Sequence, residues 1–127
     1  MFSPNPAVRS AHATQGVATI SGGSYHKWTI VFALTEGCAG EPVATVELDT
    51  VVTQSAIPLG ATTLRAAQDT IVAAPSAYLS YMGATLVSGA ITVDSANDYV
   101  TGSLAAQVTI AGAPTDITAT FNAPVCP

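Results

Sequence analysis

The feature that most constrains this chain is a two-residue alternation of apolar and other side chains, repeated along most of its length. In residues 25–34, Trp28, Ile30 and Phe32 occupy every second position. A period of two places those side chains on one face of a β-strand, whereas an α-helix needs a period of 3.6. The alternation therefore predicts strands, each with one buried and one solvated face, at residues 15–20, 25–34, 43–52, 84–94, 99–110 and 115–123.

Short clusters of turn-forming residues separate these segments, for example at residues 21–24 and 95–98. Short strands joined by tight loops are typical of an all-β fold, and we expect an antiparallel β-sandwich of the immunoglobulin-like or jelly-roll-like kind. A chain of 127 residues has the length of one domain. We expect residues 1–13, which contain two prolines and lack periodicity, to form an N-terminal tail, and residues 14–127 to form the domain.

The stretch between residues 53 and 83 shows no clear period. Residues 62–70 include leucine, arginine, alanine and glutamine, which tolerate helix, and we expect one short helix there. Short strands are expected at residues 71–74 and 78–82, on either side of Pro75.

The alternation also predicts the core, because the apolar positions of one strand share a face. In residues 84–94 this face carries Val87, Ile91 and Val93. The other strands are expected to contribute Trp28, Ile30, Phe32, Val46, Leu48, Leu104, Val108, Ile117 and Phe121.

The chain has two cysteines, Cys38 and Cys126, with no C-x-x-C spacing that would indicate a zinc or redox site. They are interpreted as a disulfide, the alternative being two buried free thiols. Closing so long a loop would stabilise the fold by roughly 4 kcal/mol in the chain-entropy model. A disulfide implies an oxidising compartment.

We therefore expect a secreted or extracytoplasmic protein, in the periplasm or at the cell surface. Residues 1–5 lack the basic and apolar regions of a signal peptide, so the chain is interpreted as a mature portion. No apolar run is long enough for a transmembrane helix. None of the asparagines lies in an N-x-S/T sequon, which is compatible with a bacterial source.

Charge excludes one class of partner. Only 9% of residues are charged, with 3 Lys and Arg against 8 Asp and Glu and a net charge of −5. Phosphate backbones are bound by basic patches, which three cations cannot build, so no nucleic acid partner is expected. The same balance argues against electrostatic attachment to a membrane.

No catalytic residues are expected. The only possible imidazole bases are His12, placed in the tail, and His26, interpreted as a surface or rim residue, and no G-x-S-x-G motif is present. Glu47 and Asp49 share one face of a strand, as paired catalytic carboxylates can, but that face is expected to be the solvated one. They are interpreted as groups that solvate a sheet face, or as charges that protect an edge strand from pairing with another chain. We therefore expect that the protein is not an enzyme and that it needs no cofactor.

Two weaker patterns point to binding. Asp94, Asn97 and Asp98 gather in one predicted hairpin loop, where oxygen ligands can bind calcium but where Asx residues are also ordinary turn formers. We expect no metal there, calcium being the alternative. Tyr78 and Tyr81 lie in the ambiguous stretch and are the candidates for an exposed ligand-binding patch.

The C-terminal third of the chain carries a resemblance to a known group. The run Y-V-T-G-S at residues 99–103, followed by I-T-A-T-F-N-A-P-V-C at residues 117–126, resembles the ending of small secreted or lipid-anchored bacterial β-proteins of unknown function. Those end in a V-x-G-S/T run and a G-T-F-x-A-x-x-C motif, from which this chain departs at Ala119. The resemblance implies export and a β-sandwich, and it implies no chemistry.

Together these features predict a non-catalytic exported structural or interaction module, at the cell surface or outside the cell, with a protein as partner. The tail before Thr14 is expected to make contacts, either on its own sheet or on a neighbouring copy. In the second arrangement the protein is a self-assembling subunit whose N-terminal tail docks on a neighbour. The alternative is a small ligand- or glycan-binding β-sandwich module that uses Tyr78 and Tyr81.

Overall fold

The computed structural model describes residues 2–3, 5, 7–20, 23–51, 53–65 and 76–127. The described residues form strands and no helix, which confirms the all-β fold class. The strands are β1 (Phe2–Ser3), β2 (Ser10–Ile20), β3 (Gly23–Ala33), β4 (Pro42–Val51), β5 (Gly60–Arg65), β6 (Ser76–Tyr81), β7 (Ala84–Ala96), β8 (Tyr99–Ile110) and β9 (Ala113–Pro124).

The strands belong to one continuous sheet instead of the two sheets of a sandwich. Its strand order is β1-β9-β8-β7-β5-β6-β4-β3-β2. β5 joins the two halves, because it pairs with β7 on one side and with β6 on the other. The β5–β6 pairing is parallel, so the sheet is mixed and the expected antiparallel sandwich is corrected to a curled mixed sheet.

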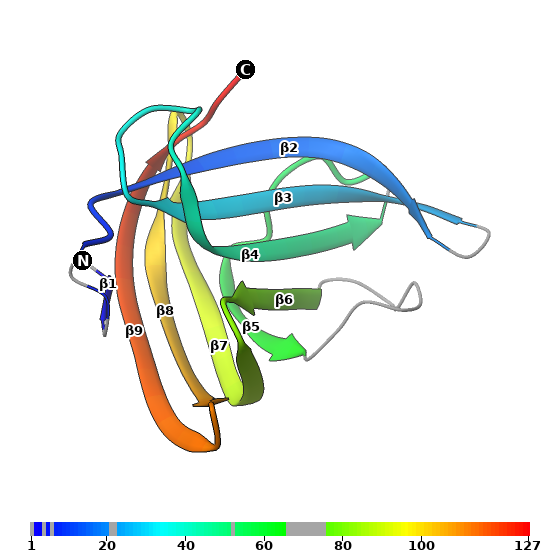
Figure 1. The fold of residues 1–127 in the computed structure, drawn as a ribbon. Helices are drawn as coiled ribbons and strands as arrows, with labels where there is room; N and C mark the ends of the chain where they lie inside the picture. Colours follow the sequence, from blue (N-terminus) through cyan, green and yellow to red (C-terminus); the bar gives the residue numbers. More distant parts are fainter. Residues whose placement is uncertain (1, 4, 6, 21–22, 52, 66–75) are drawn as a thin grey trace.

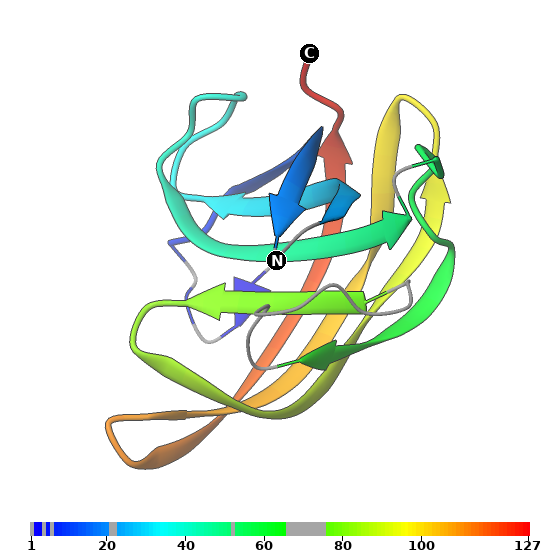
Figure 2. The same ribbon diagram turned by 90° about the vertical axis from the view of Figure 1, so that its right-hand side faces the viewer.

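The curl makes the two halves of the sheet face one another. Figure 1 shows β7, β8 and β9 running steeply across the direction of β2, β3 and β4, and Figure 2 shows the same arrangement from the side. The apolar faces of both halves point into the space between them. Side-chain alternation specifies this inward face but not the order of the strands, which explains why the sequence predicted the faces and not the single sheet.

The predicted helix at residues 62–70 is wrong where the structure describes it. Residues 60–65 form β5, with Thr62 and Leu64 buried on its inner face. Pairing with β6 and β7 overrides the weak local preference of this segment for helix. Residues 66–74, which include the rest of that helix and one expected short strand, lie outside the described residues. The second short strand, expected at 78–82, corresponds to β6.

The predicted core is confirmed, since all nine of its side chains are buried. Two further features extend it. The indole of Trp28 donates a hydrogen bond from Nε1 to the backbone oxygen of Ser55 at 2.9 Å, which satisfies its one polar group. Phe2 is also fully buried, with its ring 5.1 Å from the Phe32 ring between centroids.

Val87 departs from the predicted core. The β7–β8 register shifts between Leu86 and Ser88, so Val87 is an extra residue in a β-bulge and is 58% exposed. A bulge reverses the alternation on one side of itself. Ile91 and Val93, beyond the bulge, are buried as expected.

The two edges of the curled sheet meet near the chain ends. β1 pairs with β9 through Phe2 and Ser3, and Ala13 of β2 forms a parallel bridge with Val125. Residues 1–13, set apart above as a tail, thus include β1 and the beginning of β2. Contact of this segment with its own sheet, one of the two arrangements expected for it, is observed.

The predicted disulfide joins Cys38 and Cys126, with Cα atoms 5.9 Å apart. The N–H of Cys126 also donates to the backbone oxygen of Ala13 at 2.7 Å. The disulfide and this hydrogen bond attach the end of the chain to the loop after β3 and to β2.

Candidate functional site

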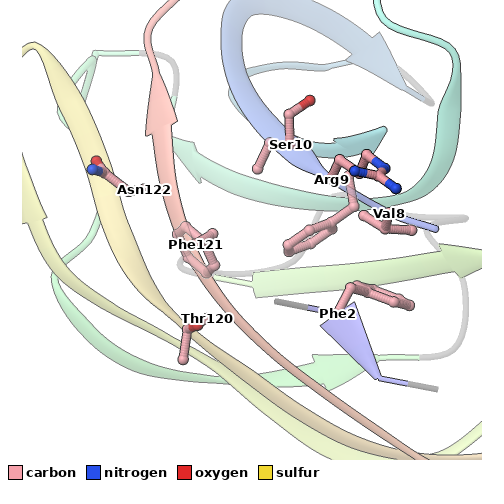
Figure 3. A pocket seen from close by; sticks show the side chains of 9 residues that line it. Phe2, Val8, Arg9, Ser10, Thr120, Phe121 and Asn122 are labelled. Carbon is pink, nitrogen blue, oxygen red and sulfur yellow. The ribbon is translucent and has the colours of Figure 1, made fainter. Parts of the chain in front are cut away.

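A cavity of about 160 Å³ opens where the two edges of the sheet meet. We call it the seam cavity. Figure 3 shows Thr120 and Phe121 of β9 on one side of it and Phe2, Val8 and Arg9 on the other. Its described lining consists of Phe2, Val8, Arg9, Ser10, Ala11, Phe32, Thr120, Phe121 and Asn122. The segment that the sequence suggested was a tail therefore builds half of a cavity.

The seam cavity has an aromatic wall and a polar rim. The Phe32 ring lies between those of Phe2 and Phe121, at centroid distances of 5.1 and 5.9 Å. On the rim, Arg9 and Asn122 are exposed. All three rings are almost fully buried, so little of their surface is open to a ligand.

The two tyrosines predicted to bind a ligand do not share a surface. Tyr78 and Tyr81 are three residues apart on β6, so their side chains point to opposite faces of the sheet. Tyr81 points inward, with its ring 5.5 Å from Phe2, whereas Tyr78 lies on the outer face opposite Glu47 and is buried. The structure therefore does not bring them together in one patch.

The carboxyl groups of Glu47 and Asp49 lie on the outer face of β4, as expected, but Asp49 is not solvated. It is only 4% exposed, and Glu47 is half-buried, which corrects the interpretation of both as solvating groups. Burial raises the pKa of Asp49 to about 8. A hydrogen bond that protonated Asp49 donates to Glu47 and the negative charge of Glu47 add to this increase, and the positive charge of Lys27 opposes it. The pair can therefore hold one proton at neutral pH.

Both histidines are buried, which corrects their interpretation as tail or rim residues. His12 lies within β2, because that strand begins at Ser10. His26 donates from Nε2 to Oε1 of Gln15 at 3.2 Å. Neither contributes to the lining of the seam cavity.

The oxygen-bearing residues of the β7–β8 hairpin remain exposed. Asp94 lies within β7 at a second register shift, between Val93 and Ser95, and Asn97 and Asp98 form the turn. The backbone oxygen of Asp98 accepts a hydrogen bond from the N–H of Val125 at 3.1 Å. Among the described residues no group of three or more His, Cys, Asp or Glu side chains converges as a metal site would require. The calcium alternative stays a prediction.

One surface was missed by the sequence reasoning, the outer edge of β2. β2 stands last in the strand order, and beyond the Ala13 bridge its edge at residues 14–20 has no partner strand in the described part of the chain. The whole of β2 contains no proline and no Asp, Glu, Lys or Arg. Val17, in the middle of this edge, is 62% exposed. The composition was visible in the sequence, but the edge position was not.

No protein-family model, no curated protein and no solved structure matches this chain. Within the residues described, no helix is long and apolar enough to cross a membrane.

Proposed function

We propose that this protein is a non-catalytic interaction module that acts outside the cytoplasm and associates with copies of itself through the open edge of β2. The observation that carries the proposal is the unguarded edge at residues 14–20. An edge strand presents unpaired N–H and C=O groups, and proteins ordinarily protect it with charges, proline or a very short strand. β2 has none of these protections.

A second copy of β2 is the partner that this edge fits best. Two identical edges can pair antiparallel about a twofold axis, so that each residue contact occurs twice. The low charge of the chain supports such pairing, because no charged side chain on β2 would be placed opposite its own copy. The buried Phe2 instead packs in its own core, so the N-terminal segment is not the proposed assembly surface.

The disulfide supports a place outside the cytoplasm. Such bonds persist in oxidising compartments and are rare where thiols are kept reduced. The proposed lack of a catalytic role is supported by the positions of the two histidines, since both are buried and neither lines the seam cavity.

Sedimentation over a wide range of protein concentration tests this proposal. Wild-type protein should associate reversibly, and Val17→Lys should shift it to monomer, because a lysine on the edge opposes pairing with its copy. Val87→Lys is the matched control, since Val87 is equally exposed but lies on the interior strand β7. A wild-type protein that stays monomeric, or a control that dissociates like Val17→Lys, contradicts the proposal.

The alternative role, a ligand- or glycan-binding module that uses Tyr78 and Tyr81, is not favoured, because the two side chains lie on opposite faces of β6.

A further inference from the structure

We infer that the association through β2 closes at two copies, with Val17 of one copy directly opposite Val17 of the other on a twofold axis. The C-terminal segment of the chain sets this register, because it covers the edge of β2 at Ala13. This inference rests on the proposed function and deepens it, since it names which residues pair with the partner copy and where the pairing stops.

The backbone groups that face the open edge belong to every second residue of β2. The N–H of Cys126 donates to the oxygen of Ala13 at 2.7 Å, and Ala13 forms its parallel bridge with the same C-terminal segment. The backbone groups of Ala13 therefore face away from β3. The N–H and C=O of one strand residue point to the same neighbour, and this direction alternates along the strand. Because the β2–β3 register has no shift, the backbone groups of Gln15, Val17 and Thr19 also face the open edge.

The C-terminal segment ends this edge at Ala13. Figure 1 shows the chain leaving β9 beside the first part of β2, while the rest of β2 extends past it together with β3. The disulfide to Cys38 holds the segment in place, as does the hydrogen bond from the N–H of Val125 to the oxygen of Asp98 at 3.1 Å. A second copy of β2 therefore cannot pair at Ala13 without displacing a segment that is attached at several points.

One antiparallel register uses all three outward-facing residues. With Val17 on the twofold axis, Gln15 of each copy lies opposite Thr19 of the other, which gives three pairs that each exchange two hydrogen bonds. A shift by two residues in one direction places Thr19 opposite Ala13, whose oxygen is already bonded to the C-terminal segment. The same shift in the other direction places Gln15 opposite a residue beyond the end of β2. Each shifted register keeps only two pairs.

The side chains along this edge suit the same register. Gln15, Val17 and Thr19 are exposed, and they lie on the face of the sheet that carries Trp28, the cross-strand partner of Gln15. In the dimer the two Val17 side chains lie opposite one another and cover apolar surface that is 62% exposed in a single copy. Each Gln15 lies opposite a Thr19, so two uncharged polar side chains meet on either side of the axis.

The opposite edge of the sheet is protected, so the association ends at two copies. In the described part of the chain, β1 pairs with β9 at Thr118 and Ala119, and the remaining β9 edge carries Pro114 and Asp116. Proline and charge are among the features that prevent an edge strand from pairing with another chain. A twofold contact uses the open edges of both copies at once, so it closes and does not grow into a fibre.

Cross-linking through introduced thiols tests this register. Val17→Cys should form a disulfide between copies at concentrations where the wild type associates. The Cα atoms of a hydrogen-bonded antiparallel pair are about 5.5 Å apart, within the range of about 4.4–6.8 Å that a disulfide requires. The two native cysteines are already joined, so the introduced thiol is the free one. Val87→Cys is the matched control, because Val87 is equally exposed on the interior strand β7, and it should give only background cross-linking.

Two further variants test the residues on either side of the axis. Gln15→Cys alone and Thr19→Cys alone should give only background cross-linking, since each position is offset from its own copy by roughly 13 Å along the strand. An equimolar mixture of Gln15→Cys and Thr19→Cys should form the mixed disulfide. A mixture of Gln15→Cys and Val17→Cys should not form one, because the register that brings these positions together needs the covered edge at Ala13.

Sedimentation of the wild type at the same concentrations separates this inference from the association itself. Association without cross-linking of Val17→Cys above the Val87→Cys background would overturn the register and leave the association standing, as would a strong mixed disulfide between Gln15→Cys and Val17→Cys. Complexes larger than two copies would overturn the closed dimer. A wild type that stays monomeric would remove the association and this inference together.

Discussion

Gly102 lies directly opposite Phe121 in the β8–β9 pair, and the Phe121 ring occupies the space that a side chain at residue 102 would need. A Cβ atom at Gly102 would be 2.9 Å from Cζ of Phe121 and closer still to the backbone oxygen of Thr92 on β7. Glycine at this position therefore permits the ring to lie over the strand and β7 to approach β8 closely.

We expect Gly102→Ala to destabilise the protein by about 1–3 kcal/mol, the usual cost of forcing extra volume into a packed core. The neighbouring backbone oxygen cannot move aside as a side chain could. Chemical denaturation of dilute protein measures the change. Gly16→Ala is the control, because a Cβ atom at residue 16 would have no neighbour within 4 Å. This variant should have the same free energy of unfolding as the wild type. Equal stability of the two variants would contradict this account.

The parts of the fold that were predictable from the sequence are those set by local alternation. Trp28, Ile30 and Phe32 are buried because a strand cannot turn one of them outward without turning all three. The same rule failed at Val87, where a bulge changes the face and no sequence signal marked it. The disulfide was predictable because the chain contains only two cysteines.

The seam cavity, the open edge and the buried carboxyl depend on which strands are neighbours. β5 pairs with β6 and β7, and β1 pairs with β9, across distances in the sequence that alternation does not specify. Phe2 was assigned to a tail because Pro4 and Pro6 follow it and the segment lacks periodicity, yet a two-residue strand suffices to place it in the core. Asp49 could not be recognised as buried, since its burial comes from neighbours on β3 and β6.

Removing the disulfide should lower the free energy of unfolding by about 2–5 kcal/mol, because the unfolded chain regains the freedom of a long loop. The double variant Cys38→Ala/Cys126→Ala avoids a leftover free thiol. Its denaturation midpoint should match that of the reduced wild type. Midpoints equal to that of the oxidised wild type would show that the bond does not stabilise the fold.

Stability should fall as the pH rises between the ordinary pKa of Asp49, 3.8, and its pKa of about 8 in the folded protein. In this window the folded protein keeps a proton that the unfolded chain has released, so raising the pH favours unfolding. One such proton gives a slope of at most about 1.4 kcal/mol per pH unit. Denaturation midpoints measured across this range provide the profile.

Asp49→Asn has no carboxyl proton to lose, so its free energy of unfolding should fall less as the pH rises. The difference between its free energy of unfolding and that of the wild type should therefore shift in favour of the variant as the pH approaches 8. Asp116→Asn, which changes an exposed carboxylate on β9, should keep the wild-type profile. Parallel profiles for wild type and Asp49→Asn would show that the buried carboxyl does not hold the proton.

The central claim, association through the edge of β2, is tested most directly by residue-resolved hydrogen exchange at low and high protein concentration. Amides at residues 14–20 that do not bond to β3 face solvent in the monomer and bond to a second copy in the proposed assembly. They should therefore become protected as the concentration rises, while exchange in the β7–β8 turn stays unchanged. Equal exchange of the β2 edge at both concentrations, or protection confined to another surface, would contradict the account.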